Sequence, residues 1–201
     1  MTHVEGDFEE SEAATARQRI VRWANWGVTN EGRIHYAQRR PIDGRRQPGK
    51  LPLTTDCSGF VTDCYDWARA PDPNGNGFNG QGYTGTLLAH CRLISESQLL
   101  PGDLVVFGPG AGSHVVVMVG SGASGQVVSH GSESGPKRYS LTAAKTYFPR
   151  PVRALRCPGV GALAEMDSDP DLELGDPGLE EGFVVDPDGS NPALGDPGDD
   201  A

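Results

Sequence analysis

The stretch DCSGFVTDCYDWAR, residues 56–69, decides the fold class expected for this chain. Asp56 is a favourable N-cap, and Pro71 and Pro73 lie just beyond the stretch, where they end a helix. The apolar side chains between them recur at helical spacing. They are Phe60, Val61, Cys64, Tyr65, Trp67 and Ala68. We therefore predict a helix from Asp56–Cys57 to about Arg69, with one face in the core and a cysteine at its start.

The segments around this helix give two further helices and two loops. Residues 13–26 have apolar positions at helical spacing and stop at a glycine, which predicts a first helix. Residues 37–52 are basic and rich in Gly and Pro, and residues 71–85 contain five glycines, so both predict loops. A short helix is expected around Thr86–Leu93.

Downstream of residue 100 the pattern changes to short β-branched runs separated by Gly-rich turns. The runs are Leu104–Phe107, Val115–Val119 and Val127–Ser129, with a further strand expected near Val152–Arg156. Such runs predict an antiparallel sheet. Helices first and strands afterwards indicate an α+β domain.

Charge divides the chain into three parts. The middle, residues 13–156, has 17 basic and nine acidic residues, whereas residues 1–12 have five acidic residues and residues 157–201 have 13, both without Lys or Arg. We predict an acidic leader (1–12), a folded basic domain (13–158) and an acidic Gly/Pro/Asp-rich tail (159–201). The tail buries too little apolar surface to offset its ordering entropy, so we expect it to be disordered or to bind a partner.

The cysteines, at positions 57, 64, 91 and 157, include neither a CxxC pair nor the spacing of a zinc site. Cys57 and Cys64 would lie two turns apart on one helix, about 10 Å by helical rise, which is too far for a disulfide. We therefore expect a reactive thiol with structural cysteines in place of a disulfide framework, and neither a metal nor another cofactor.

Cys57 is the strongest candidate for chemistry. At the start of a helix, free backbone N–H groups and the helix dipole stabilise a thiolate, and the same N–H groups can bind the oxyanion of a tetrahedral intermediate. Ser58 and Gly59 are small and leave the sulfur approachable. The alternative is a buried structural cysteine, which is the common state of a free cysteine.

A thiol nucleophile needs a base, commonly histidine, and the base needs a positioning partner. His114 precedes one predicted strand and His130 ends the next. In a hairpin with Val119 opposite Gly125, His114 falls opposite His130, on the same face and about 5 Å apart at Cβ. A shift of one residue in this register would put the two side chains on opposite faces.

Four segments together resemble the NlpC/P60 family of cysteine peptidases. DCSGFV (56–61) resembles its nucleophile signature, and LPGDLVVF (100–107) the turn and strand that lead to its histidine. SHV (113–115) resembles the start of its general-base strand, and VSHGS (128–132) the place of its third polar residue. They occur in family order within roughly residues 30–156. The resemblance implies a papain-like α+β domain, with N-terminal helices packed on a small antiparallel sheet.

By this resemblance, Cys57 attacks the scissile carbonyl. His114 activates the thiol and protonates the leaving amine, and His130 positions His114. The implied activity is a metal-free, thiol-dependent hydrolysis of peptide bonds in the stem peptides of bacterial peptidoglycan. A CHAP-type amidase, which cuts the sugar–peptide link, is a close alternative.

Three further residues are candidates for oxyanion or substrate binding. The family has a tyrosine upstream of the nucleophile, and Tyr36 is its counterpart here, although Arg39–Arg40–Pro41 replaces the usual Gly-Gly after it. Asp56 and Ser58 flank the nucleophile and could line the substrate site; N-capping explains Asp56 equally well. The 71–85 loop either rims this site and sets specificity or decorates the surface.

The N-terminal residues MTHVEGD lack the pattern of a secretory signal. We therefore expect an enzyme that reaches the cell wall as a phage lysin, in a virion tail, or by a non-Sec route. A different class of function is a structural component of a phage tail or secretion apparatus, with a weak or inactive domain, that binds a partner protein through the acidic tail.

Nucleic-acid binding is another function that a basic segment such as residues 13–156 can have. Its clustered arginines have no helix-turn-helix or aromatic RNA-binding signature beside them, so we expect no specific nucleic acid. They are Arg33, Arg39, Arg40, Arg45 and Arg46. No apolar run approaches the roughly 18 residues of a membrane span, so we expect no membrane insertion.

Overall fold

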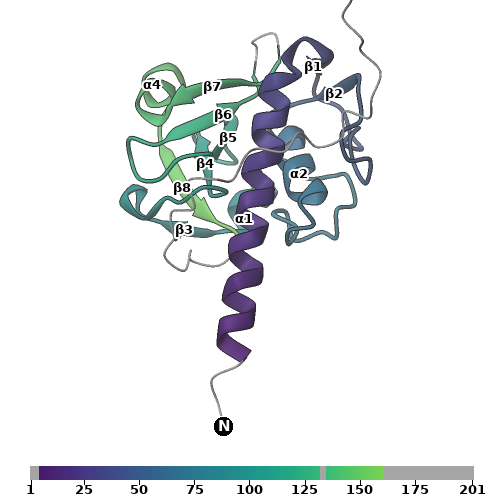
Figure 1. Ribbon diagram of the computed structural model, residues 1–201. Coiled ribbons are helices and arrows are strands. Elements are labelled where there is room, and N and C mark those ends of the chain that lie inside the picture. The colour runs from purple at the N-terminus through teal and green to yellow at the C-terminus, as the bar shows by residue number, and fades with distance from the viewer. Residues whose placement is uncertain (1–4, 132–134, 161–201) are drawn as a thin grey trace, which may run out of the picture. The chain divides into compact units, whose positions relative to one another are not determined.

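The computed structural model describes residues 5–131 and 135–160, and side chains from Ala16 onward. These residues form the predicted α+β domain, with helices on both faces of an antiparallel sheet (Figure 1). Helix α1 begins at Glu5, inside the segment predicted as an acidic leader, and the tail beyond residue 160 lies outside the described residues. No helix of the described part is long and apolar enough to cross a membrane.

The helices follow the predicted order along the chain. Trp67 ends the nucleophile helix two residues before the expected Arg69. The third helix begins two residues before Thr86 and ends at His90, and Leu93, expected in this helix, lies in a strand instead. A short helix after residue 140 was not predicted, because seven residues with two β-branched threonines give little periodicity. The helices are α1 (Glu5–Thr29), α2 (Cys57–Trp67), α3 (Thr84–His90) and α4 (Leu141–Tyr147), with 3₁₀ turns at Glu31–Arg33 and Glu96–Gln98.

Six strands form the main sheet in the order β3-β8-β4-β5-β6-β7, and every neighbouring pair is antiparallel. The four predicted strands are all present, within one residue of their expected bounds. The main-sheet strands are β3 (Arg92–Ile94), β4 (Leu104–Phe107), β5 (His114–Met118), β6 (Gln126–Ser129), β7 (Lys137–Ser140) and β8 (Val152–Arg156).

A separate two-stranded parallel pair, β1 (Ile34–Tyr36) and β2 (Leu53–Thr55), precedes α2. Tyr36 pairs with Thr55, two residues before Cys57. The sequence did not predict this pair, because strands of three residues give no readable alternation. Its effect is to bring the chain around Tyr36 next to the start of the nucleophile helix.

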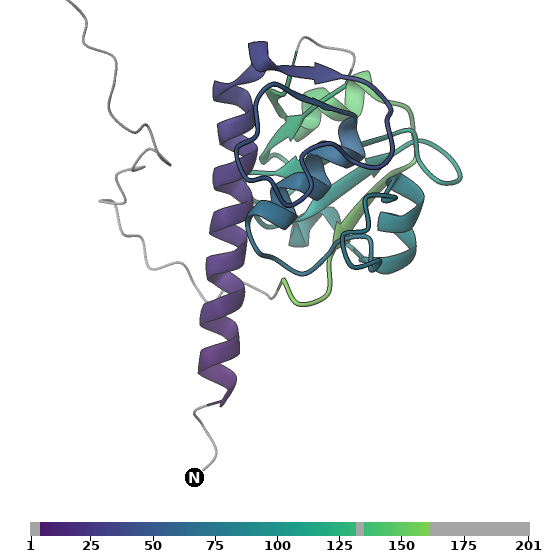
Figure 2. The same ribbon diagram turned by 90° about the vertical axis from the view of Figure 1, so that its right-hand side faces the viewer.

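The two faces of the main sheet carry two separate cores. Val115, Val117 and Val128 point to the face that α1 and α2 cover. Val116 and Met118 point to the other face, where Leu141 of α4 packs. Figure 2 shows α1 and α2 side by side against one face of the sheet. Because strand residues alternate between faces, the parity of each residue decides which core it joins.

The register of the β5–β6 hairpin differs from the prediction by one residue. Val116 pairs with Ser129 and Val117 with Val128, so His114 does not lie opposite His130. The turn between these strands is one residue longer than the predicted loop. A register shift of one residue separates two side chains onto opposite faces of the sheet, and this is what the structure has.

A buried ion cluster joins α1 to the far end of the sheet. Asp103 accepts hydrogen bonds from Arg17 Nη1 at 2.9 Å and from Arg156 Nη2 at 2.7 Å, and its side chain is fully buried. Arg17 also donates to the carbonyl oxygens of Pro101 and Val160, both at 2.7 Å. We call Arg17, Asp103 and Arg156 the Asp103 cluster. It holds together segments that lie up to 143 positions apart in sequence.

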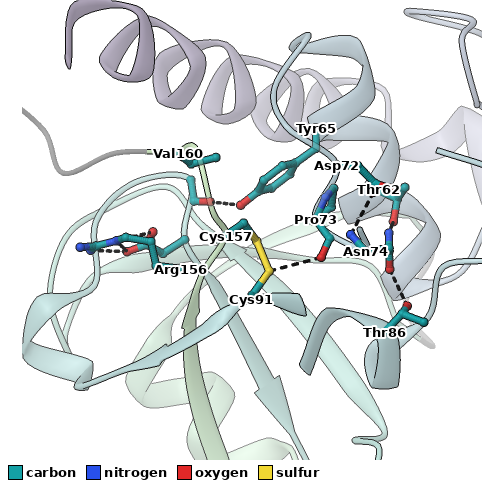
Figure 3. The surroundings of a disulfide bond; sticks show 12 residues. Thr62, Tyr65, Asp72, Pro73, Asn74, Thr86, Cys91, Arg156, Cys157 and Val160 are labelled. Carbon is teal, nitrogen blue, oxygen red and sulfur yellow. Dashed lines mark hydrogen bonds and ion pairs between the residues drawn. A yellow bond between two sulfur atoms is a disulfide. The ribbon is translucent and has the colours of Figure 1, made fainter. Parts of the chain in front are cut away.

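A disulfide joins Cys91, after α3, to Cys157, after β8 (Figure 3). The expectation of unpaired structural cysteines was therefore wrong for these two, whereas Cys57 and Cys64 are free as predicted. The pairing was not foreseen because 66 positions separate the two cysteines, and only the sheet topology brings them together. Nearby, Tyr65 donates a hydrogen bond to the Gly102 carbonyl oxygen at 2.5 Å.

Candidate active site

The start of α2 has the predicted N-cap. Asp56 has an extended backbone, and its Oδ1 accepts a hydrogen bond from the Gly59 N–H at 2.7 Å. The Ser58 hydroxyl donates to the same oxygen at 2.9 Å. A β-carbon at Gly59 would lie 2.1 Å from Thr55 Oγ1, so this position of the signature has no room for a side chain. The sequence thus fixes Cys57 as the first residue of a tightly packed helix.

The electrostatic surroundings of Cys57 differ from the simple expectation of a stabilised thiolate. Burial and the neighbouring Asp56 carboxylate raise the pKa of the thiol from 9.0 to about 11. The backbone N–H groups of Val115, Ser58 and Cys57 itself act in the opposite direction but are outweighed. The resting nucleophile is therefore a neutral thiol, because desolvation disfavours the charged form.

Two predicted site residues lie on the same side of the sheet as Cys57. The Tyr36 and His130 rings contact edge to face, with centroids 5.5 Å apart. His130 also packs against Phe60, one turn after Cys57 on α2, with ring centroids 5.7 Å apart. His130 Nε2 lies 3.1 Å from the Thr55 carbonyl oxygen, to which it donates in the tautomer with a proton on that nitrogen.

His114 lies on the other face of the sheet. Its ring stacks on Phe148, with centroids 3.9 Å apart, and its Nε2 lies 2.9 Å from Ser129 Oγ. Burial, with a smaller contribution from His130, lowers the pKa of His114 from 6.5 to about 4, so its imidazole is neutral at neutral pH. Among residues 16–131 and 135–160, no hydrogen bond joins His114 to Cys57.

An arginine that the sequence analysis did not select as a site residue contacts both neighbours of the nucleophile. Arg40 Nη1 donates to Asp56 Oδ2 at 3.0 Å, and Nη2 donates to Ser58 Oγ at 2.9 Å. We call Arg40, Asp56 and Ser58 the Asp56 cluster. Asp56 and Ser58, predicted to bind substrate, are both buried and bonded within this cluster. The replacement of Gly-Gly by Arg39–Arg40–Pro41 was the signal in the sequence that could have found it.

The 71–85 loop lies against this side of the site. Gly82 accepts a hydrogen bond from Arg40 Nε at 2.8 Å, and Gly80 accepts one from the Ile42 N–H at 3.0 Å. At the other end of the loop, Thr84 Oγ1 donates to the Gly112 carbonyl oxygen at 3.2 Å, two residues before His114. The loop therefore connects the segment beside Asp56 to the segment that leads into β5.

Asn74 anchors this loop to the nucleophile helix. Its amide nitrogen donates to Thr62 Oγ1 of α2 at 2.9 Å, and its amide oxygen accepts from Thr86 Oγ1 of α3 at 2.7 Å (Figure 3). In the described part of the chain, no group of three or more His, Cys, Asp or Glu side chains is arranged to hold a metal ion.

A cysteine at the capped start of a helix packed on an antiparallel sheet, with histidines on the adjacent strands, defines a papain-like α+β domain of the cysteine-peptidase class. The model of the NlpC/P60 family matches residues 45–145, half of the chain, and includes Cys57, His114 and His130. The chain belongs to the NlpC/P60 family.

The relatives found by sequence share one segment with this chain. The probable endopeptidase p60 of Listeria innocua is 43% identical over 75 residues, which are 37% of this chain and 14% of that protein. The probable endopeptidase p60 of Listeria grayi is 40% identical over 72 residues, 35% of this chain and 12% of that protein. The matched segment is thus a small part of these relatives.

Two solved structures from Mycobacterium tuberculosis have the same fold. The peptidoglycan hydrolase RipB is 19% identical, with a TM-score of 0.51, over 73% of this chain and 66% of that chain. A hypothetical invasion protein is 17% identical, with a TM-score of 0.52, over 74% of this chain and 64% of that chain. At these identities the likeness concerns the fold.

Proposed function

We propose that this protein is a thiol-dependent hydrolase that cuts peptide bonds in the stem peptides of bacterial peptidoglycan, with Cys57 as nucleophile. The observation that carries the proposal is the position of Cys57 at the Asp56-capped start of α2, on the sheet face that it shares with Tyr36 and His130. Membership of the NlpC/P60 family supports the peptidase activity, since the Listeria relatives are named probable endopeptidases.

The chemistry balances without a metal or a redox partner. Cys57 Sγ attacks the carbonyl carbon while its proton passes to a histidine, and that proton then goes to the leaving amine as the C–N bond breaks. Water hydrolyses the resulting thioester and regenerates the thiol. N–H groups at the start of α2 are suited to bind the oxyanion, and Tyr36 is the candidate side-chain donor beside them.

The family resemblance gives the role of base to His114 and the positioning role to His130. A second assignment, in which His130 accepts the proton, is favoured by its contact with Phe60 on the nucleophile helix. His114→Gln and His130→Gln distinguish the two assignments by single-turnover kinetics. Loss of the base slows thioester formation by about 10²–10⁴-fold. Loss of a positioning residue costs less and leaves a base-dependent pH profile.

The pH dependence follows from the thiol. Because the pKa of Cys57 is raised to about 11, the thiolate fraction, and with it the rate of alkylation by iodoacetamide, increases up to that pH. His114, with a pKa lowered to about 4, stays neutral and able to accept a proton down to mildly acidic pH. A rate of alkylation that is constant above pH 8 would contradict the raised thiol pKa.

The test of the activity compares wild type with Cys57→Ala on peptidoglycan of several wall chemotypes, with released fragments identified by mass spectrometry. Cleavage by wild type alone supports the proposal, and the fragment masses separate a peptide-bond cut from the sugar–peptide cut of a CHAP-type amidase. If neither protein releases fragments while both are folded, the alternative of an assembly protein with an inactive domain takes its place.

For the whole chain we propose a basic catalytic domain, residues 13–158, between an acidic leader, 1–12, and an acidic partner-binding tail, 159–201. The charge separation supports it, since residues 157–201 carry 13 acidic residues and neither Lys nor Arg. The finer assignment, a phage lysin or a tail-associated wall-opening enzyme, is tested by truncation after residue 160. A lysin keeps its wall-clearing activity, whereas a tail-associated enzyme loses co-purification with its assembly.

A further inference from the structure

Arg40 uses every donor of its guanidinium around the nucleophile. Nε donates to the Gly82 carbonyl oxygen and Nη1 to that of Arg39, at 2.8 and 2.6 Å. The remaining donors reach Asp56 and Ser58, at 3.0 Å from Nη1 to Asp56 Oδ2, 3.4 Å from Nη2 to Asp56 Oδ1 and 2.9 Å from Nη2 to Ser58 Oγ. A guanidinium has five N–H donors. Arg40 therefore acts on its protein neighbours, with no donor left over for a substrate.

We propose that Arg40 is a positioning residue for the thiol reaction, which acts through Asp56 to fix the start of α2 and to offset the negative charge beside Cys57. The inference rests on the proposed function for its consequence in catalysis, but its effect on the Cys57 thiol is measurable without any substrate.

The geometry explains why such a residue is needed. The Asp56 carboxylate caps α2 from the position next to the nucleophile, so the group that orders the helix also places a negative charge beside Cys57. That charge is one of the causes of the raised thiol pKa, after burial. A cation 3.0 Å from the carboxylate reduces its field at the sulfur while keeping its oxygens in the capping position.

The shape of arginine matters as well as its charge. Both terminal nitrogens of Arg40 donate to Asp56, and Nη2 also donates to Ser58, while Nε ties the same group to Gly82 in the 71–85 loop. A lysine supplies one compact charge and cannot hold three such partners in one plane. Arg40→Lys therefore keeps the charge but loses the coupling between the loop and the cap.

The primary experiment measures the pH dependence of iodoacetamide alkylation at Cys57 in the full chain, with peptide mapping to separate Cys57 from Cys64. We expect Arg40→Gln to slow alkylation at pH 8 by about three- to tenfold and to move its midpoint to higher pH. Asp56→Asn, which keeps a good N-cap, moves the midpoint to lower pH. In the Asp56→Asn background, Arg40→Gln has a smaller effect than in wild type.

Two controls separate this effect from a general loss of charge or of stability. Arg45 donates to the Phe78 carbonyl oxygen in the same loop, so Arg45→Gln removes a neighbouring arginine and leaves the alkylation profile of Cys57 unchanged. Arg40→Lys gives a midpoint between those of wild type and Arg40→Gln. On a soluble stem peptide, Arg40→Gln lowers kcat about tenfold or more with a smaller change in KM.

The proposal is overturned if Arg40→Gln is folded and alkylates with the wild-type pH profile, or if its effect is equally large with and without Asp56. A lower melting temperature without a shifted profile leaves Arg40 a purely structural residue. If Arg40→Gln fails to fold, the test rests on Arg40→Lys. A wild-type pH profile of Cys57 alkylation in Arg40→Lys rejects the positioning role of the Arg40 guanidinium. A shifted profile in a protein that cuts no peptidoglycan refutes the proposed function and leaves the inference intact.

Discussion

The Asp56 cluster and the Asp103 cluster both contain an arginine–aspartate ion pair, but they stabilise different parts of the molecule. In the Asp103 cluster the carboxylate is fully buried between two arginines, and the partners are segments distant in sequence. In the Asp56 cluster Arg40 is partly exposed, and the carboxylate caps the helix that begins with Cys57. An arginine–aspartate pair therefore stabilises the fold in one place and adjusts a reactive group in the other.

The largest expected difference between the clusters is in stability. Asp103→Asn leaves two arginines without their buried counter-charge, which costs about 3–5 kcal/mol of unfolding free energy. Asp56→Asn keeps a residue that caps helices equally well and loses the ion pair with the partly exposed Arg40, which costs less, about 1 kcal/mol. Urea denaturation of both variants checks this. Equal losses would mean that the two clusters have the same role.

We expect the Cys91–Cys157 disulfide, like the Asp103 cluster, to affect the stability of the fold and not the reactivity of Cys57. Its 66-residue separation predicts a loss of about 2–4 kcal/mol for the double variant Cys91→Ala/Cys157→Ala, mainly because the unfolded chain gains freedom. We expect Cys57 alkylation to be unchanged in this variant at temperatures where it is folded. An altered alkylation profile would show that the disulfide also organises the site.

Asp63 is a third buried carboxylate, and among the described residues no arginine forms an ion pair with it. Neither side-chain oxygen of Asp63 has a well-formed hydrogen bond within the described part of the chain, although the Gly44 backbone N–H and Lys50 lie near enough to oppose the rise in its pKa. Burial, then the neighbouring Asp66 and Asp43 carboxylates, raise the pKa of Asp63 well above 3.8. A raised pKa in the folded state means that its contribution to stability is present below pH 3.8 and is lost as pH rises.

Asp63→Asn therefore stabilises the protein at neutral pH, by about 1–3 kcal/mol, since a neutral amide replaces a carboxyl group that is costly to ionise there. The gain shrinks as pH falls and the native carboxyl becomes protonated. Thermal melts of wild type and variant from pH 4 to pH 8 measure it. A variant that is less stable than wild type at pH 7 would contradict this prediction, because it would mean that the ionised Asp63 carboxylate stabilises the fold.

The sequence predicted the elements of the fold better than the contacts between them. The α2 stripe and the β-branched strands are local patterns, and both were correct. The register of the β5–β6 hairpin was wrong by one residue, because the glycine-rich turn does not fix its own length. That error put His114 and His130 on one face in the prediction.

The contacts of Arg40 could not be predicted from the sequence, for a different reason. Sixteen positions separate it from Asp56. Arg40 follows β1 and Asp56 follows β2, so the two residues meet through the β1–β2 pair, whose three-residue strands gave no pattern. The disulfide was missed in the same way, since Cys91 and Cys157 meet only through the pairing of β3 with β8. Residues that act through tertiary contacts need the topology before they can be found.

The most direct test of the central claim, that Cys57 carries the chemistry, is titration of activity against its alkylation. Samples of wild type are alkylated to increasing extents with iodoacetamide, and the modified fraction of Cys57 and the rate of peptidoglycan cleavage are measured on the same samples. The account predicts that the rate falls in proportion to the unmodified fraction of Cys57, while Cys64, which is 0% exposed where Cys57 is 6% exposed, stays unmodified. Cleavage that persists after complete alkylation of Cys57 would contradict it.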